Sequence, residues 1–408
     1  MNLRSINAGF NIDQEKNEGV VSRAASLISE VRRAFKHKYP NVRTTRLCTQ
    51  PLIEVNSLQP SDVGGLVKEI DLLCRRLGID WFCTPIGQCQ TSEDLEFVRS
   101  VPQVMRNSRI SFSNVIVTQS RRIDFEVVNE CARQVKKISR TGKAGFDNFR
   151  FCVSANVKPN GAFFPYSWHQ GEDGFSLGME AIDVILDNTK KDAGLAETGS
   201  RIIKALSGEF EDIDRIAKDV ENKTGLKYYG LDLSLAPYPT EAHSIGKAIQ
   251  RLGVDKFGAN GTLFLTSYLT NLLKHLEKSL SIRTVGFTGV MYPVLEDKFL
   301  TESNDAGLLS MESLLLYSAV CGCGPDMIPL PGDISEREIA SVILDMCSLA
   351  LLLDKPLIAR LVPIPNRRGG QRTQFNYHFF NNTKIMHAKK LSLTRNVLQN
   401  NPMFEFCR

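Results

Sequence analysis

Two cysteines and two aspartates stand in the segment YSAVCGCGPDMIPLPGD, where an apolar helical stretch runs into glycines and prolines. Glycine permits close approach of backbones and proline stiffens a loop, so the segment could present Cys321 as a nucleophile. Activation of that thiol would need a neighbouring base or positive charge. The alternative is a rigid loop around a buried thiol, a common environment for cysteine. We take Cys321 and Asp326 as candidate catalytic residues.

Further carboxylates occur in two other segments. Glu296 and Asp297 follow a strand-like run and a proline in GFTGVMYPVLEDKFL, and Asp232 and Ser234 alternate with leucines in GLDLSLAPYP. Such alternation places Asp232 and Ser234 on one face of a strand. Three carboxylates could divide proton-transfer work or hold a divalent metal ion. Alternatively, Glu296 and Asp297 could be first-turn charges that complement a helix dipole, and Asp232 could be a buried residue that satisfies backbone groups.

An aromatic loop, NVKPNGAFFPYSWHQ, begins at Asn156 and contains His169. It could wall a pocket in which His169 acts as acid or base, although packing would use the same aromatic residues. Arg46 and Arg360 lie inside the strand-like runs TTRL and IARL, where a buried cation needs an acidic partner or an anionic ligand. These arginines could clamp a carboxylate or phosphate. Asn156 and Ser234 complete the predicted substrate-binding set.

Short apolar runs and helical periodicity alternate along the chain and must position these residues. Helices are predicted at residues 21–35, 61–77, 125–138, 176–186 and 262–280. Strands are predicted at residues 44–48, 81–85, 114–117, 149–154, 228–235, 283–287 and 357–362. The alternation implies crossover connections, and therefore an α/β protein with a mainly parallel sheet covered by helices and ligands at the carboxyl ends of its strands. No linker or repeat divides the chain, which favours a single domain over residues 1–408.

Composition narrows the function classes. The chain has 408 residues, 42% of them hydrophobic and 23% charged, which is typical of a soluble globular protein. Its net charge of +5 is dispersed, so nucleic acid is not an expected partner. No apolar run approaches the length of a membrane span, and the first residues lack the pattern of a secretory signal, so a cytoplasmic location without membrane partners is expected. Dinucleotide-binding, Walker A and His-Glu-x-x-His motifs are absent, so no nucleotide cofactor is expected.

Taken together, the motifs resemble the family catalogued as domain of unknown function 711, also called uncharacterised protein family 0210. The resemblance covers nearly the whole chain and is carried by TTRL at 44–47, FFPYSWH at 163–169, GLDLSLAPYP at 230–239, FGANGTL at 257–263, GFTGVMYPVLED at 286–297, YSAVCGCGPDMIPLPGD at 317–333 and KPLIARLVPIP at 355–365. It implies a fold related to the pyruvate formate-lyase type of glycyl radical enzymes, a large α/β barrel with an active-site cysteine on a loop inside it. Cys321 matches that cysteine. A radical glycine is expected near the C-terminus of such enzymes, but no glycine follows Gly370, so radical catalysis is not expected.

The leading hypothesis is a non-radical lyase, hydrolase or transferase that acts on an anionic or carboxylated metabolite in a polar barrel pocket. The rival hypothesis is a catalytically idle ligand-binding or regulatory protein that uses the same cavity. Either protein would bind a small molecule and is expected to form a homo-oligomer. A divalent metal ion is the cofactor that the carboxylates could support.

Overall fold

A mainly parallel, nine-stranded sheet runs through the molecule in the order β11-β7-β5-β3-β2-β1-β8-β9, with β4 paired to β5. The computed structural model describes all residues of the chain except 15, 92, 119–120, 191, 400–402 and 407–408. The strands are β1 Asn2–Gly9, β2 Val42–Cys48, β3 Trp81–Cys83, β4 Gly87–Gln88, β5 Ser111–Thr118, β6 Arg122–Asp124, β7 Phe151–Ala155, β8 Gly174–Glu180, β9 Lys227–Asp232, β10 Ile328–Pro331, β11 Leu357–Ala359, β12 Leu361–Ile364 and β13 Met403–Glu405. Within the large sheet, β8 runs antiparallel to β1 and β11 antiparallel to β7.

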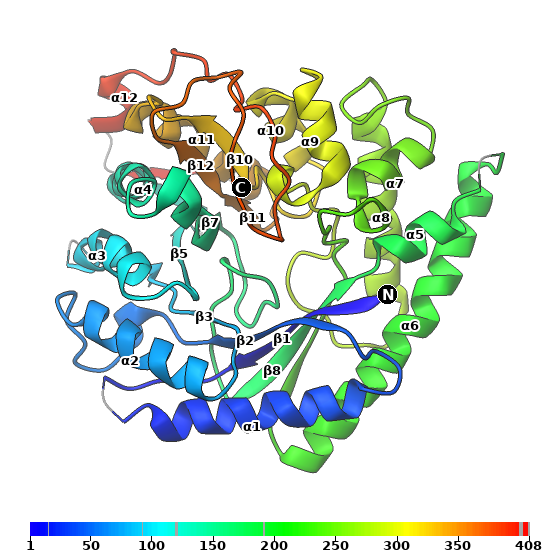
Figure 1. The fold of residues 1–408 in the computed structure, drawn as a ribbon, viewed down its shortest axis with the longest axis horizontal. Helices are drawn as coiled ribbons and strands as arrows, with labels where there is room; N and C mark the ends of the chain where they lie inside the picture. The colour runs from blue at the N-terminus through cyan, green and yellow to red at the C-terminus, as the bar shows by residue number, and fades with distance from the viewer. Residues whose placement is uncertain (15, 92, 119–120, 191, 400–402, 407–408) are drawn as a thin grey trace.

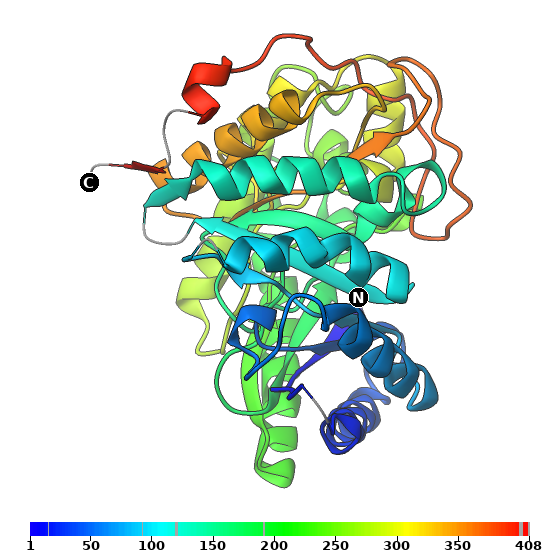
Figure 2. The same cartoon turned by 90° about the vertical axis from the view of Figure 1, so that its left-hand side faces the viewer.

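Helices cover the outside of this sheet (Figure 1). They are α1 Glu18–Phe35, α2 Val63–Arg76, α3 Asp94–Asn107, α4 Phe125–Ile138, α5 Ile182–Asn188, α6 Leu195–Thr224, α7 Ile245–Arg251, α8 Thr262–Ser279, α9 Lys298–Asp305, α10 Met311–Ser318, α11 Glu336–Leu352 and α12 Arg395–Gln399. Short 3-10 turns are η1 Leu52–Glu54, η2 Lys143–Arg150, η3 Glu241–His243 and η4 Val294–Glu296. Figure 2 shows α1 to α4, the crossover helices of the first half of the chain, stacked along one outer face.

The sheet curls into a half-barrel. Single parallel bridges join Leu231 to Thr284, Leu235 to Val290 and Pro293 to Asp326, and β10 pairs with β12 beyond them. The aromatic loop after β7 lies inside the curve, because Ser5 and Asn7 of β1 donate hydrogen bonds to the carbonyl oxygens of Ala162 and Gly161 at 2.7 Å each. The concave face of the sheet is therefore filled by a loop instead of a helix.

The α/β class and the mainly parallel sheet agree with the prediction from the sequence. The predicted helix at residues 176–186 is wrong in its first half, because β8 occupies Gly174–Glu180 and only Ile182–Asn188 is helical. A Cβ atom at Gly178 would lie 2.6 Å from Ser5 Oγ, so close strand pairing there requires glycine. Strand β1 and helices α3, α6 and α11 were not predicted. Among the described residues, no helix is both long and apolar enough to cross a membrane.

Candidate functional site

A small chamber of about 30 Å³ lies on the concave side of the sheet. Its charged lining residues are Arg4, Arg46, Glu296, Asp326 and Arg360. Aromatic and apolar residues complete the wall: Trp81, Phe149, Phe163, Phe164, Tyr166, Ala236, Pro237, Met291, Pro293, Ile358 and Phe379. A volume of this size holds roughly two water molecules or one small ion. Several lining residues lie in the strands themselves, so the chamber is not confined to the carboxyl ends where ligands were expected.

Four of the five charged side chains form one ion-pair network. Arg360 donates from Nε and Nη2 to the two oxygens of Asp326, at 2.5 and 2.9 Å, and from Nη2 to Glu296 Oε1 at 2.7 Å. Arg4 Nη2 donates to the other oxygen of Glu296 at 3.1 Å, and its Nη1 donates to Glu180 at 2.8 Å. Burial raises the pKa of Glu296, although both guanidinium groups favour its charged form. Arg360, a predicted anion clamp, is thus already neutralised by protein carboxylates.

Arg46 on β2 differs from its neighbours. Its Nε donates to Thr44 Oγ1 at 2.9 Å and its Nη1 to the carbonyl oxygen of Ala162 at 3.3 Å. The guanidinium lies 5.0 Å from the ring centres of both Trp81 and Phe164. Among the residues that the structure describes, no carboxylate lies within ion-pair distance of it. Burial, together with the charge of Arg4, lowers the pKa of Arg46 to about 9, which leaves it protonated at neutral pH.

Asp232 and Ser234 lie behind one wall of the chamber. Asp232 accepts hydrogen bonds from Ser234 Oγ at 2.6 Å and from the hydroxyl of Tyr166, a lining residue, at 3.1 Å. The amides of Ser234 and Phe287 donate to the same carboxylate at 3.0 and 3.2 Å. Burial raises the pKa of Asp232 against these hydrogen bonds. In this arrangement Asp232 holds Tyr166 in the wall and does not itself face the cavity.

Asp297 serves the starts of two helices. It accepts from the amides of Phe299 and Leu300 at 2.9 Å each, as the N-cap of α9, and from Ser244 Oγ and the amide of Ile245 at 2.7 and 2.6 Å, where α7 begins. Its carboxylate therefore has no free oxygen for a metal ion. Across the described part of the chain, no group of three or more His, Cys, Asp or Glu side chains could hold a metal. The carboxylates thus do not fit the divalent-ion site considered from the sequence.

His169 lies outside the chamber, in the core before β8. Its Nδ1 is 2.8 Å from Asn160 Oδ1, and its Nε2 has no hydrogen-bond partner among the described residues. Burial lowers the pKa of His169 to about 4, so the ring is neutral at physiological pH. The chamber and this histidine do not share a ligand-accessible space.

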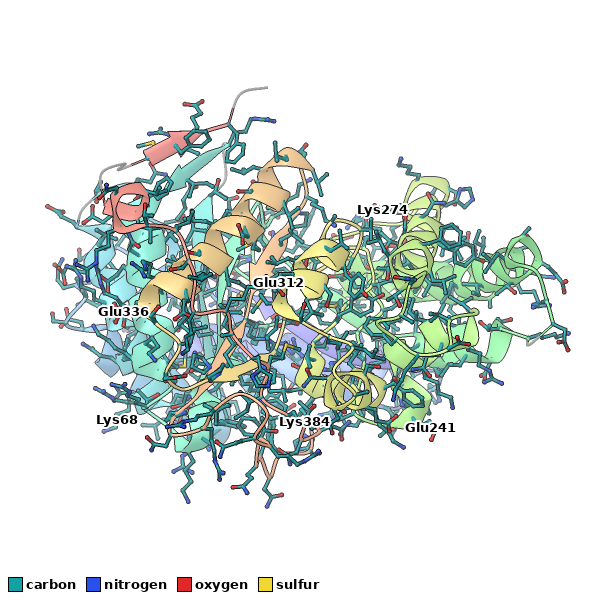
Figure 3. The ribbon with its side chains drawn as sticks, turned by 90° about the horizontal axis from the view of Figure 1, so that it is seen from above. Lys68, Glu241, Lys274, Glu312, Glu336 and Lys384 are labelled. Atoms are coloured by element: carbon teal, nitrogen blue, oxygen red, sulfur yellow. The ribbon has the colours of Figure 1, made fainter. Side chains whose placement is uncertain are left out.

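Cys321 and Asn156 line a second, open cleft of about 770 Å³. The cleft lies between the residue that follows β7, the loop at 286–288, α8 and the turn after α10. Lys274 of α8 also lines the cleft. Figure 3 shows Lys274 in the upper part of the view, whereas Glu241 and Lys384 lie in the lower part. The structure thus separates the predicted site into two parts, with Arg46, Glu296, Asp326 and Arg360 in the chamber and Cys321 and Asn156 in the cleft.

Two functional candidates were not found from the sequence. Arg4 lies in β1, and the same signal that identified Arg46, a cation inside a strand-like run, could have identified it. Lys355, which lines the cleft, donates from Nζ to the carbonyl oxygens of Ser318 and Cys321. No local pattern marks Lys355, because its partners precede it by more than thirty residues in the chain.

Comparisons with known proteins agree with the resemblance. Residues 1–381 match the family described as "Uncharacterised ACR (DUF711)". An uncharacterised protein family 0210 member of Thermoanaerobacter is 26% identical over 404 residues, covering 92% of this chain and 88% of that protein. Members from Clostridium perfringens and Methanosarcina acetivorans are 25% and 24% identical, covering 76% and 88% of this chain and 71% and 80% of their own lengths. The chain belongs to the DUF711 family, whose members are also named uncharacterised protein family 0210.

Proposed function

We propose that the protein is a non-radical enzyme, a lyase, hydrolase or transferase, that acts on a small carboxylated metabolite bound at Arg46. The observation that carries this proposal is the buried guanidinium of Arg46 on the chamber wall without a carboxylate partner among the described residues. A buried cation is costly unless it is paired, and an arginine offers a planar donor set that fits a carboxylate. An anionic ligand would supply the missing partner.

Charge and size narrow the ligand class. The chamber lining carries three arginines and two carboxylates, so one positive charge is left over when all are ionised. A monoanion would bring the lining to neutrality, whereas a dianion would leave an excess of negative charge. A cavity of about 30 Å³ favours a ligand of few heavy atoms, or the tip of a longer one that displaces a wall residue.

Glu296 is the strongest candidate for proton transfer in the chamber. Burial raises the pKa of Glu296 above its ordinary value, which makes its carboxylate a stronger base than that of an exposed glutamate. Tyr166, held by Asp232, lines the same cavity and could orient the ligand through its ring. In this scheme Arg46 binds the carboxylate and Glu296 exchanges the proton.

The rival function, an idle ligand-binding or regulatory protein, is favoured by one observation. Both oxygens of Glu296 and both oxygens of Asp326 accept hydrogen bonds from arginines. Carboxylates engaged in this way are poorer bases than free ones, because the guanidinium charges stabilise the deprotonated form. A binding protein needs no base and could use the same chamber.

Binding is tested by thermal unfolding of the purified chain with small monocarboxylates, dicarboxylates and inorganic phosphate. A monocarboxylate at a hundredfold excess over its Kd should stabilise the folded state by about 2.7 kcal/mol and raise Tm. The variant Arg46→Met should lose this ligand-dependent rise, and Arg46→Lys should keep part of it. Arg372→Met, which removes an exposed arginine paired with Asp305, is the matched control. An unchanged rise in Arg46→Met would refute the proposal.

Turnover separates the two functions once a ligand is identified. Material released from the native protein by denaturation and analysed by mass spectrometry gives the first candidates. Conversion of the bound compound by wild-type protein, lost in Glu296→Gln while binding persists, supports the enzyme. Binding without conversion in the wild type supports the idle protein.

We further propose that the curled sheet is a form of the barrel of the pyruvate formate-lyase type. The parallel bridges that continue the sheet past β9 support this interpretation. A cytoplasmic location and a homo-oligomer also remain predictions. Light scattering of the purified chain tests the oligomer, and cell fractionation tests the location.

A further inference from the structure

Cys321 lines the open cleft, and a second thiol, Cys323, stands two residues later in the buried turn that follows α10. The two cysteines are separated by one residue, and the thiol of Cys323 donates to the carbonyl oxygen of Gly324 at 3.5 Å. Both cysteines are free thiols. Neither takes part in the anion chamber, so the pair is a feature that the proposed function does not use.

A glycine is required between the two cysteines. A Cβ atom at Gly322 would lie 2.9 Å from Gly289 Cα, and the amide of Gly322 donates to the carbonyl oxygen of Val290 at 2.7 Å. The turn is therefore packed against the backbone at residues 289–290. This packing fixes the backbone segment that carries the two cysteines.

A cation sits beside the pair. Lys355 Nζ donates to the carbonyl oxygens of Ser318 at 3.0 Å, Ala319 at 3.3 Å and Cys321. The neighbouring Cys323 side chain and the charge of Lys355 lower the pKa of Cys321 to about 6, whereas burial raises that of Cys323 well above its usual value. One sulfur is therefore prepared as a thiolate nucleophile and the other as a protonated partner.

A second observation points to a small polar ligand in the same cleft. Thr288, a lining residue, is 1% exposed and has a φ of 46°, which is rare for a β-branched residue. Its Oγ1 is buried and has no hydrogen-bond partner among the described residues. An unsatisfied buried hydroxyl costs free energy, and strained residues of this kind concentrate at functional sites. A small molecule with oxygen atoms in the cleft could satisfy it.

We propose that Cys321 and Cys323 form a redox-active dithiol that is oxidised to an intrachain disulfide by a hydroperoxide. The Cys321 thiolate attacks one peroxide oxygen, so that an S–O bond forms, the O–O bond breaks and the second oxygen leaves as hydroxide or alkoxide. Cys323 then attacks the Cys321 sulfur, the S–S bond forms and the S–O bond breaks. The departing hydroxide takes the proton of the Cys323 thiol and becomes water. Overall, the dithiol loses two electrons and two protons, and the hydroperoxide is reduced to water and an alcohol or a second water.

The burial of the thiols selects the oxidant. Cys321 is 1% exposed and Cys323 is fully buried, so a small oxidant reaches the Cys321 sulfur more readily than a protein disulfide does. Hydrogen peroxide is small enough to enter from the cleft. A low-pKa thiol next to a resolving cysteine is the arrangement that peroxide-reactive sites share.

Cys89 provides an internal comparison in the same protein. It is more exposed than Cys321, but burial raises its pKa to about 12. If exposure decided reactivity, Cys89 would be oxidised and alkylated first. If thiolate character decides it, Cys321 would react first.

The test treats the full-length protein with hydrogen peroxide at pH 7 and maps thiols by peptide mass spectrometry without reduction. We expect the peptide with residues 321–323 to lose two hydrogen atoms and regain them with dithiothreitol. In untreated protein, iodoacetamide should label Cys321 at least about tenfold faster than Cys89. Cys323→Ser should stop at a Cys321 sulfenic acid that dimedone traps, and Cys347→Ser, which removes a buried thiol on α11, should behave as wild type.

Three results would overturn the proposal. The first is faster labelling of Cys89 than of Cys321. The second is peroxide oxidation that leaves the 321–323 peptide unchanged while other cysteines react. The third is oxidation of Cys321 directly to sulfinic acid with Cys323 present and still reduced. The labelling and mapping use the wild-type chain, so the test does not depend on folding of the variants.

Discussion

Arg46 and Arg360 have the same side chain and nearly the same burial, yet their surroundings give them different roles. Arg360 contacts two carboxylates and is paired within the protein. Arg46 contacts neutral oxygens and two aromatic rings, and no carboxylate among the described residues lies within ion-pair distance of it. The role of a buried arginine is thus decided by its partners, and only the unpaired one has reason to bind a ligand.

His169 shows how burial can turn a predicted acid or base into a stability determinant. Its pKa of about 4 in the folded protein lies below the ordinary value of 6.5, so between these pH values the unfolded chain binds more protons. The free energy of unfolding should therefore rise with pH across this interval and be flat above it, a contribution of roughly 3 kcal/mol. In chemical denaturation, the unfolding free energy of His169→Gln should fall by about 3 kcal/mol less than that of the wild type when the pH is lowered from 6.5 to 4. Above pH 6.5, the plots of unfolding free energy against pH should run parallel for the two proteins. Equal losses in both proteins would contradict this account.

At the scale of elements, the single carboxylate of Asp297 accepts hydrogen bonds at the starts of two helices that are distant in sequence. Asp297 caps α9 and also accepts from Ser244, which caps α7 by accepting from the amide of Lys247 at 3.0 Å. The unpaired amides at the first turns of two helices are thus satisfied through one buried carboxylate. The adjacent residues Glu296 and Asp297 therefore have different roles, because Glu296 lines the chamber and Asp297 accepts hydrogen bonds from the starts of the helices.

We expect Asp297→Ala to destabilise the protein by about 2 to 3 kcal/mol, because it removes a helix cap and leaves buried donors at α7 unsatisfied. Asp297→Asn should cost less, since the amide oxygen can still accept. Urea denaturation measures both changes. If Asp297 instead held a metal ion, the alanine variant would show reduced metal content by elemental analysis, and wild-type Tm would fall with a chelator.

At the scale of the whole molecule, the arginine network connects distant parts of the chain. Arg4 in β1 bonds to Glu180 at the end of β8 and to Glu296 in η4, and Arg360 bonds to Asp326 before β10. The first strand is thereby linked to a segment 292 residues away. The half-barrel is held across its concave side by these buried charges as well as by its apolar core.

The contrast between the two arginines should appear in global stability. Arg360→Met leaves Asp326 and part of Glu296 as uncompensated buried charges, and we expect it to cost about 3 to 5 kcal/mol. Arg46→Met removes an unpaired buried cation, and its unfolding free energy without ligand should equal or exceed that of the wild type. Denaturation curves in buffer free of carboxylates compare the two. Equal destabilisation by both variants would mean that Arg46 is also paired within the protein.

Residue chemistry and local periodicity determined the α/β class, the mainly parallel sheet, the family and the acidic partners that the buried Arg360 requires. These properties depend on residue type and short-range spacing, which can be read along the chain. Tertiary structure alone decided that Arg360 is paired and Arg46 is not, that Cys321 faces a different cavity from Glu296, and that residues 174–180 form a strand. The physical reason is that each of these outcomes depends on a partner far away in sequence, whose position is set by how the sheet curls.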